Sequence, residues 1–204
     1  MRNYFALCAL ALTVMLSSCG SNKNVAFDGN KSVENPPAIT KALEKSATRA
    51  YGTATQFDLG FATRTATAAA RQQLASAIMQ IITSNNAIDN LAYSLYATDG
   101  KKSGTAKDEE SKTQEMVEAI VAEIPVSGAV IIENNIYKTK DGQYQVFVCV
   151  EYQGKALELA DKMADGLRKY LEQTVSEEKR SEINKEVKDF RENTLQRIRE
   201  MNGE

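Results

Sequence analysis

The sequence predicts an α+β fold: a small antiparallel sheet with a late hairpin packs on an alanine-rich helix, and a long C-terminal helical region follows. Residues 60–83 carry apolar side chains at helical spacing. Residues 129–137 and 144–152 are rich in β-branched and aromatic side chains and flank an Asp-Gly turn. Residues 155–201 return to helical spacing with many charges.

Two short elements are expected before the alanine-rich helix. A helix is predicted around residues 39–46, after Pro36-Pro37, and a strand over residues 48–57. Gly52 lies within this strand and weakens the prediction, because glycine has no side chain to pack there.

The alanine-rich helix has a clear start and a clear apolar face. Asp58 can cap a helix that begins near Gly60 and runs to Thr83. Its alanines would allow a sheet or another helix to approach closely. The expected apolar stripe comprises Ala66, Ala70, Leu74, Ala77, Ile78, Ile81 and Ile82. Ser84-Asn85-Asn86 interrupts the pattern, which then resumes for about three turns from Ile88.

A polar loop and another helix separate this region from the hairpin. Residues 98–110 contain no apolar anchor and are expected to form a mobile loop. Ser111 and Gln114 match a capping box, so a helix is predicted from there until Pro125 stops it.

The second hairpin strand places apolar side chains on one face of the sheet. Tyr144, Val146, Val148, Val150 and Tyr152 share that face, because strand side chains alternate. We expect the helix at 60–83 to cover it. Cys149 points to the other face and is interpreted as a small buried hydrophobe.

The last region divides into an amphipathic part and a charged part. Residues 38–175 are assigned to the α+β domain and residues 176–204 to a charged C-terminal helix. A thin apolar stripe in this helix includes Val187, Phe190 and Ile198. Two interpretations stay open: a helix that is solvated or packed on its own domain, or a surface for a partner helix with these three residues as the partner-binding side chains.

The N-terminus carries a lipid-modification signal. Arg2 precedes an apolar stretch from Tyr4 to Leu16, and residues 16–20 read Leu-Ser-Ser-Cys-Gly. As a helix this stretch spans about 20 Å, less than the roughly 30 Å of a bilayer core, which favours a removed signal peptide over residues 1–18. The Cys19 thiol would carry diacylglycerol, and its new amine could be acylated as well. Residues 19–37 are predicted to be a flexible tether.

Composition argues against several function classes. The chain has no histidine, so it lacks the usual general base and zinc ligand. Ser176 and Lys179 match an S-x-x-K motif by chance, because no K-T-G or S-D-N follows. We therefore expect no enzyme, no metal site and no cofactor other than the lipid. A net charge of −2 gives no reason to bind nucleic acid. Once Cys8 is removed and Cys19 is lipidated, Cys149 has no disulfide partner.

Three features together resemble a known family. They are the Cys19 processing box, the alanine-rich helix at 66–75 after a strand with a glycine, and the late strand at 144–148 (Tyr-Gln-Val-Phe-Val). The chain resembles the lipoprotein-twenty family of small Gram-negative outer-membrane lipoproteins over residues 45–153. The resemblance implies an α+β domain related to the N-terminal domain of a flagellar assembly protein, an envelope location and no established enzymatic activity. The chain departs from the family pattern in lacking a tryptophan near the hairpin and in its charged tail after residue 175.

The leading hypothesis is a lipid-anchored outer-membrane protein that serves as a non-enzymatic binding or scaffolding module. Residues 20–23 contain no acidic run of the kind that exports some lipoproteins to the cell surface, so a periplasm-facing domain is expected. Its partners would be the membrane, through the lipid, and another envelope protein or a second copy. The alternative is a lipoprotein that binds a small ligand or cell-wall glycan between the sheet and the helix at 60–83.

Overall fold

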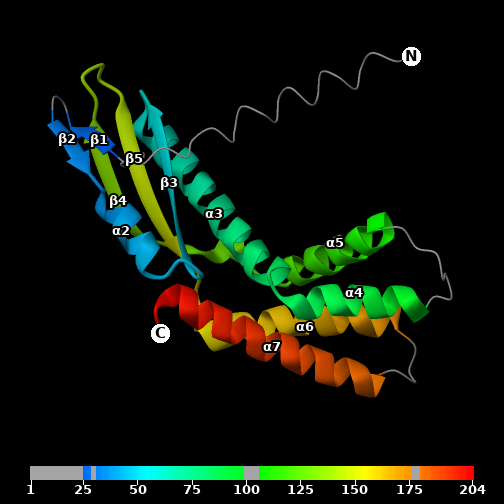
Figure 1. The fold of residues 1–204 in the computed structure, drawn as a ribbon. Helices are drawn as coiled ribbons and strands as arrows, with labels where there is room; N and C mark the ends of the chain where they lie inside the picture. The colour runs from blue at the N-terminus through cyan, green and yellow to red at the C-terminus, as the bar shows by residue number, and fades with distance from the viewer. Residues whose placement is uncertain (1–24, 29–30, 99–105, 176–179) are drawn as a thin grey trace, which may run out of the picture.

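The computed structural model describes residues 25–28, 31–98, 106–175 and 180–204, and it confirms the α+β fold (Figure 1). The strands are β1 (Val25–Asp28), β2 (Lys31–Glu34), β3 (Arg49–Gln56), β4 (Val130–Lys138) and β5 (Tyr144–Glu151). The helices are α2 (Pro37–Glu44), α3 (Leu59–Thr83), α4 (Asn86–Thr98), α5 (Ala106–Ala122), α6 (Ala156–Thr174) and α7 (Arg180–Asn202), with a short 3-10 turn at Val126–Gly128.

The main sheet has the strand order β3-β5-β4, and both pairings are antiparallel. The predicted hairpin is confirmed as β4 and β5, and Gly142 in its turn has a φ of 79°, which glycine adopts without strain. β3 lies on the other side of β5 and is antiparallel to it. Gln56 therefore pairs with Tyr144 beside the turn, and Arg49 pairs with Glu151 at the opposite end.

Helix α3 covers one face of this sheet, as expected. The Asp58 carboxylate accepts a hydrogen bond from the Phe61 amide at 2.6 Å, which confirms the predicted cap. The predicted stripe of α3 is buried apart from Ala77, which is half-buried, and it shares one core cluster with Val146, Val148 and Val150. The first half of this 25-residue helix lies on the sheet, and its second half continues past the sheet into the helical layer (Figure 1).

Gly52 lets β3 and α3 come into backbone contact. A Cβ at this position would overlap the Ala66 carbonyl oxygen and the Ala70 amide nitrogen. The glycine that weakened the strand prediction is therefore the residue that makes the close sheet–helix packing geometrically feasible.

Helix α2 covers the opposite face of the sheet, which the sequence did not predict. Ala38, Ile39 and Ala42 form a second small core with Phe147 and Cys149. Polar contacts fasten the helix to the strands: the Ala38 amide donates to Asn135 Oδ1 at 2.7 Å, and Lys41 pairs with Glu133 at 2.6 Å. The sheet is thus buried on both faces along β5, and the interpretation of Cys149 as a buried hydrophobe is confirmed.

The Lys41–Glu133 pair predicts acid-sensitive stability. The hydrogen bond from Lys41 holds the pKa of Glu133 below its ordinary value of 4.5. A carboxyl whose folded pKa is lowered stabilises the fold above its ordinary pKa, and this contribution is lost as pH falls through the folded pKa. Glu133→Gln should therefore have a lower melting temperature than the wild type at about pH 6. The difference between the two melting temperatures should be smaller at about pH 3. Exposed Glu172→Gln is the control, and an equal gap at both pH values would contradict the role of the pair.

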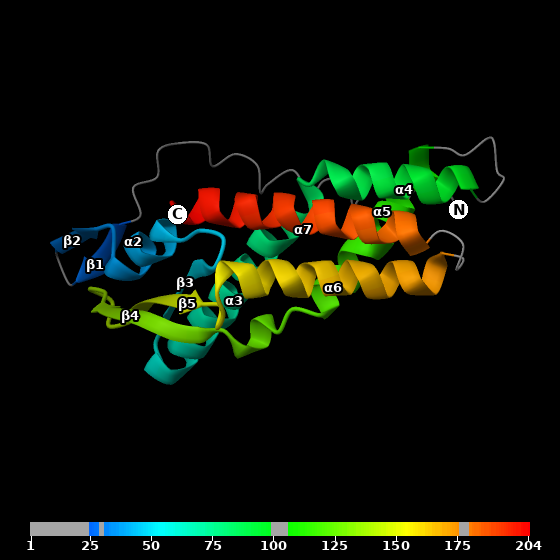
Figure 2. The ribbon, with the colours of Figure 1, turned by 90° about the horizontal axis from the view of Figure 1, so that it is seen from below.

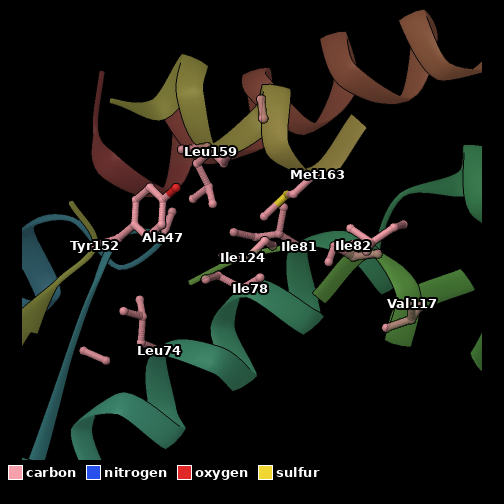
Figure 3. Close-up of a cluster of buried hydrophobic side chains, with 14 of the residues drawn as sticks. Ala47, Leu74, Ile78, Ile81, Ile82, Val117, Ile124, Tyr152, Leu159 and Met163 are labelled. Carbon is pink, nitrogen blue, oxygen red and sulfur yellow. The ribbon is translucent and has the colours of Figure 1, made fainter. Parts of the chain in front are cut away.

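The remaining helices form a layer beyond the sheet (Figure 2). Neighbouring pairs are α4 with α5, α5 with α6 and α6 with α7, and Figure 2 shows α6 and α7 running side by side. Gly166 on α6 lies where this helix crosses α5, because a Cβ there would come within 2.8 Å of Ile120 Cα. The C-terminal half of α3 packs into this layer through Ile78, Ile81 and Ile82, which contact side chains of α5 and α6 (Figure 3).

Helix α7 belongs to the same core as the sheet. Val187, Phe190 and Ile198 are at most 1% exposed and lie in the cluster that also holds Val148. Its C-terminal end is fastened next to β3, where the Ala47 amide donates to Asn202 Oδ1 at 3.2 Å and Ser46 donates to the Met201 carbonyl at 3.0 Å. The boundary at 175/176 therefore does not separate two cores.

Three sequence predictions need correction. Residues 25–28 and 31–34, predicted to be part of a flexible tether, form the antiparallel strands β1 and β2, with Asp28 opposite Lys31. The overlooked signal is Asp28-Gly29, a hairpin dipeptide that follows the short apolar run Val25-Ala26-Phe27. Ser111 and Gln114 do not start a helix, because α5 begins at Ala106, and Ser111 lies within it. Most of the predicted mobile loop, residues 99–105, lies outside the described residues; residues 106–110 belong to α5.

Candidate functional site

A polar site lies where α3 ends, α4 begins and α7 passes. Ser84 closes α3, with its amide donating to the Gln80 carbonyl at 3.0 Å. Asn85 follows between the two helices, and Asn86 starts α4. An asparagine suits this junction, because its side chain can cap the next helix while its backbone leaves the previous one.

Asn85 joins the junction to α7 through a fully used side chain. Its Oδ1 accepts from the Ala87 amide at 3.1 Å, which caps α4. Its Nδ2 donates to the Phe190 carbonyl at 3.2 Å and to Thr194 Oγ1 at 3.1 Å. Asn85 and Thr194 are 7% and 1% exposed, so these hydrogen bonds form in a nearly dry environment. In the sequence, residues 84–86 indicate only an interruption of the apolar pattern, but an asparagine before an apolar helical run is also a capping signal.

A hollow of about 350 Å³ opens above this network. Its lining residues come from the α3–α4 junction and from the C-terminal half of α7. They are Ile81, Ser84, Asn85, Asn86, Asn193, Thr194, Gln196, Arg197 and Glu200. The volume falls in the range of small-molecule sites, which is about 300–1,000 Å³.

The lining offers amide, hydroxyl and charged hydrogen-bonding groups. Asn86, Asn193 and Gln196 present amides, which both donate and accept. Arg197 and Glu200 add one positive and one negative charge. Arg197 Nη1 lies 4.0 Å from Glu200 Oε2. Gln196 Nε2 also donates to Glu200 Oε1 at 2.9 Å. Such a surface suits a neutral or zwitterionic polar ligand with hydroxyl or amide groups.

Removing the Asn85 side chain should loosen this junction. Asn85→Ala loses a helix cap, worth about 1 kcal/mol, and removes the two hydrogen bonds to α7, so we expect a loss of about 2 kcal/mol in unfolding free energy. Denaturant unfolding measures it, and Asn86→Ala on the exposed side of the junction is the matched control. Equal stability of both variants would contradict the anchoring role.

The ligand site expected between the sheet and the helix at 60–83 is not present there. The space is filled, because Gly52 meets the α3 backbone and Val146, Val148 and Val150 are fully buried against the helix. Short alanine side chains allow contact rather than a cavity. The hollow lies instead at the other end of α3.

Cys149 has no features of a reactive thiol. It is fully buried, and burial raises its pKa to about 11, although nearby Arg49 acts in the opposite direction. Since the thiolate is the nucleophilic form, this thiol stays protonated and inert at neutral pH.

The structure does not bring the predicted site residues together. Cys19 lies outside the described residues. Val187, Phe190 and Ile198 are core side chains, so their interpretation as a partner-binding stripe is wrong and the alternative of packing on the chain's own domain is confirmed. The stripe is thin because only its buried positions need apolar side chains, while the rest of α7 faces solvent.

Two further features concern only the described part of the chain. Within residues 25–28, 31–98, 106–175 and 180–204 there is no group of three or more metal-ligating side chains. Among the helices of these same ranges, none combines the length and the apolar character that a bilayer crossing requires.

Comparisons with protein-family models, with curated proteins and with solved structures find no match to this chain. The resemblance to the lipoprotein-twenty family therefore rests on the sequence motifs and stays a prediction.

Proposed function

We propose that this protein is a lipid-anchored lipoprotein of the cell envelope whose domain acts as a non-enzymatic binding or scaffolding module. The observation that carries the proposal is the Leu-Ser-Ser-Cys-Gly sequence at residues 16–20 behind an apolar segment. Only a thiol at this position can carry the thioether-linked diacylglycerol, and two or more acyl chains anchor a protein stably.

The location follows from the residues next to the lipid. Gly20, Ser21, Asn22 and Lys23 contain no acidic run of the kind that exports some lipoproteins to the cell surface, which favours a domain on the periplasmic side of the outer membrane. The resemblance to the lipoprotein-twenty family supports the same location. A domain with one continuous core across sheet and helices suits a module that displays its surface to partners or ligands.

Lipidation at Cys19 predicts a labelling pattern among the three cysteines. In a Gram-negative host given a tagged fatty acid, the wild-type protein should take up label and Cys19→Ala should take up none. Cys149→Ala is the matched control and should be labelled like the wild type, because its buried thiol is not a site of modification. Label that persists in Cys19→Ala, or is missing from the wild type, would refute the anchor.

The polar hollow favours a second candidate function, the binding of a small polar ligand such as a cell-wall glycan or peptide fragment. Its amide and charged groups match the hydroxyl, amide and carboxylate groups of such fragments. A ligand at about 100 times its Kd should add about 2.7 kcal/mol to stability. A thermal-shift screen with peptidoglycan fragments tests this, with Asn193→Ala abolishing the shift and Glu192→Ala outside the hollow preserving it. No stabilisation at saturating fragment would count against ligand binding and leave the scaffold proposal in place.

A further inference from the structure

The described structure begins a short distance from the proposed lipid. Val25, the first residue of β1, follows Cys19 by six positions. Consecutive Cα atoms are about 3.8 Å apart, so Val25 lies within about 23 Å of the Cys19 Cα whatever path the chain takes. This step rests on the proposed lipidation, which would hold Cys19 at the bilayer surface.

The hairpin that starts at Val25 is attached to one end of the sheet. Val33 on β2 packs with Tyr137 and Phe147 in the core shared with α2. β1 contacts β4, and Figure 1 places the hairpin beside the β4–β5 turn, far from α4 to α7. The anchor therefore acts on this end of the molecule, which we name the sheet end: the β1–β2 hairpin, the β4–β5 turn at residues 139–143 and the β3–α3 junction at residues 57–61.

The sheet end exposes two large aromatic side chains. Phe57 is 71% exposed and Phe61 is 50% exposed. Phe57 directly follows β3, whose last residue Gln56 pairs with Tyr144 beside the β4–β5 turn, and Phe61 lies in the first turn of α3. Phe57 has the highest exposed fraction of the large apolar side chains in the described part of the chain. Exposed aromatic side chains at one edge of an anchored domain are typical of a surface that enters the headgroup region.

Basic side chains lie beside Phe61 and beside Tyr144 of the neighbouring strand β5. The Arg64 guanidinium lies 5.9 Å from the Phe61 ring centroid, and Lys138 Nζ lies 5.8 Å from the Tyr144 ring centroid. Exposed Lys140 extends the basic group in the turn. The acidic residues of the sheet end are Asp28 and Glu34 of the hairpin, Asp58, which caps α3, and Asp141 in the turn. Long basic side chains beside aromatics can reach lipid phosphates while their stems cover apolar surface.

We propose that the sheet end is a membrane-contact surface: Phe57 and Phe61 enter the headgroup region of the bilayer that holds the Cys19 lipid, and Arg64, Lys138 and Lys140 contact lipid phosphates. The helical layer of α4 to α7 then points away from the membrane. The polar hollow on α7 consequently faces the aqueous space, where a soluble ligand or partner can reach it.

The absence of tryptophan provides a direct test. The mature lipidated protein is reconstituted in vesicles of phosphatidylethanolamine and phosphatidylglycerol whose acyl chains carry bromine, a quencher of tryptophan fluorescence. Phe57→Trp places the single tryptophan at the sheet end. Met79→Trp is the matched control, since Met79 is also exposed, at 43%, and lies on α3 about 27 Å further along the helix than Phe61.

The proposal expects several-fold stronger quenching in Phe57→Trp than in Met79→Trp, and weaker quenching in Phe57→Trp once Arg64 and Lys138 are also replaced by glutamine. Equal quenching, quenching only in Met79→Trp, or no quenching in either variant would overturn it. Circular dichroism of each variant confirms the fold before reconstitution. The mass of the purified protein shows whether lipid is present, so a failure of the anchor is distinguished from a failure of the orientation.

Discussion

Gly52→Ala is expected to lose at least about 3 kcal/mol of unfolding free energy, a large part of the roughly 5–15 kcal/mol of a typical domain. The added methyl group would overlap backbone atoms of Ala66 and Ala70, and a helix backbone cannot rotate away as a side chain can. Relief requires β3 and α3 to separate, which would open the contact that buries the α3 alanines.

Gly128→Ala is the matched control for this prediction. A Cβ at Gly128 meets nothing within 4 Å, so the same chemical change should leave stability within about 0.5 kcal/mol of the wild type. Urea denaturation of both variants measures the difference. A Gly52→Ala protein as stable as Gly128→Ala would mean that the sheet and α3 are not in backbone contact.

Phe190→Ala is expected to cost about 3–5 kcal/mol, the range for removing a buried phenylalanine. Phe190 is fully buried and lies where α7 meets the α3–α4 junction, since its carbonyl accepts a hydrogen bond from Asn85. The cavity would sit between helices that close the same core, so the remaining side chains cannot easily collapse into it.

Exposed Glu192→Ala on the same helix is the control and should change stability by less than about 0.5 kcal/mol. Thermal unfolding of the two variants separates the core role of Phe190 from the partner-binding interpretation. A Phe190→Ala protein that keeps its melting temperature but loses a cellular partner would restore the partner-binding interpretation and contradict the packing.

The elements with strong local signals were predictable. Asp58 caps α3, the alanine stripe is buried and the strands around Asp141-Gly142 form a hairpin, because each of these features depends on residues close together in the sequence. The fold class followed from the same signals. Gly52 shows the limit of this reasoning: the sequence suggests a weak strand, and only the position of α3 reveals why glycine is needed.

Features that depend on distant contacts were missed or misread. The cover of the second sheet face by α2 and the burial of Val187 and Phe190 join segments about a hundred or more residues apart. A thin apolar stripe in a charged helix reads the same whether the helix packs on its own domain or on a partner. The hollow is likewise lined by residues 81–86 and residues 193–200. No local sequence pattern predicts that these two segments lie side by side.

The mass of the mature N-terminal peptide tests the central claim most directly. The protein is purified from membranes of a Gram-negative host, digested and analysed by mass spectrometry. The account predicts that the first residue is Cys19 and that it carries diacylglycerol on sulfur and an acyl chain on its amine. A mature protein that begins at another residue, or a Cys19 with a free thiol, would contradict the lipid anchor and with it the membrane-facing orientation of the sheet end.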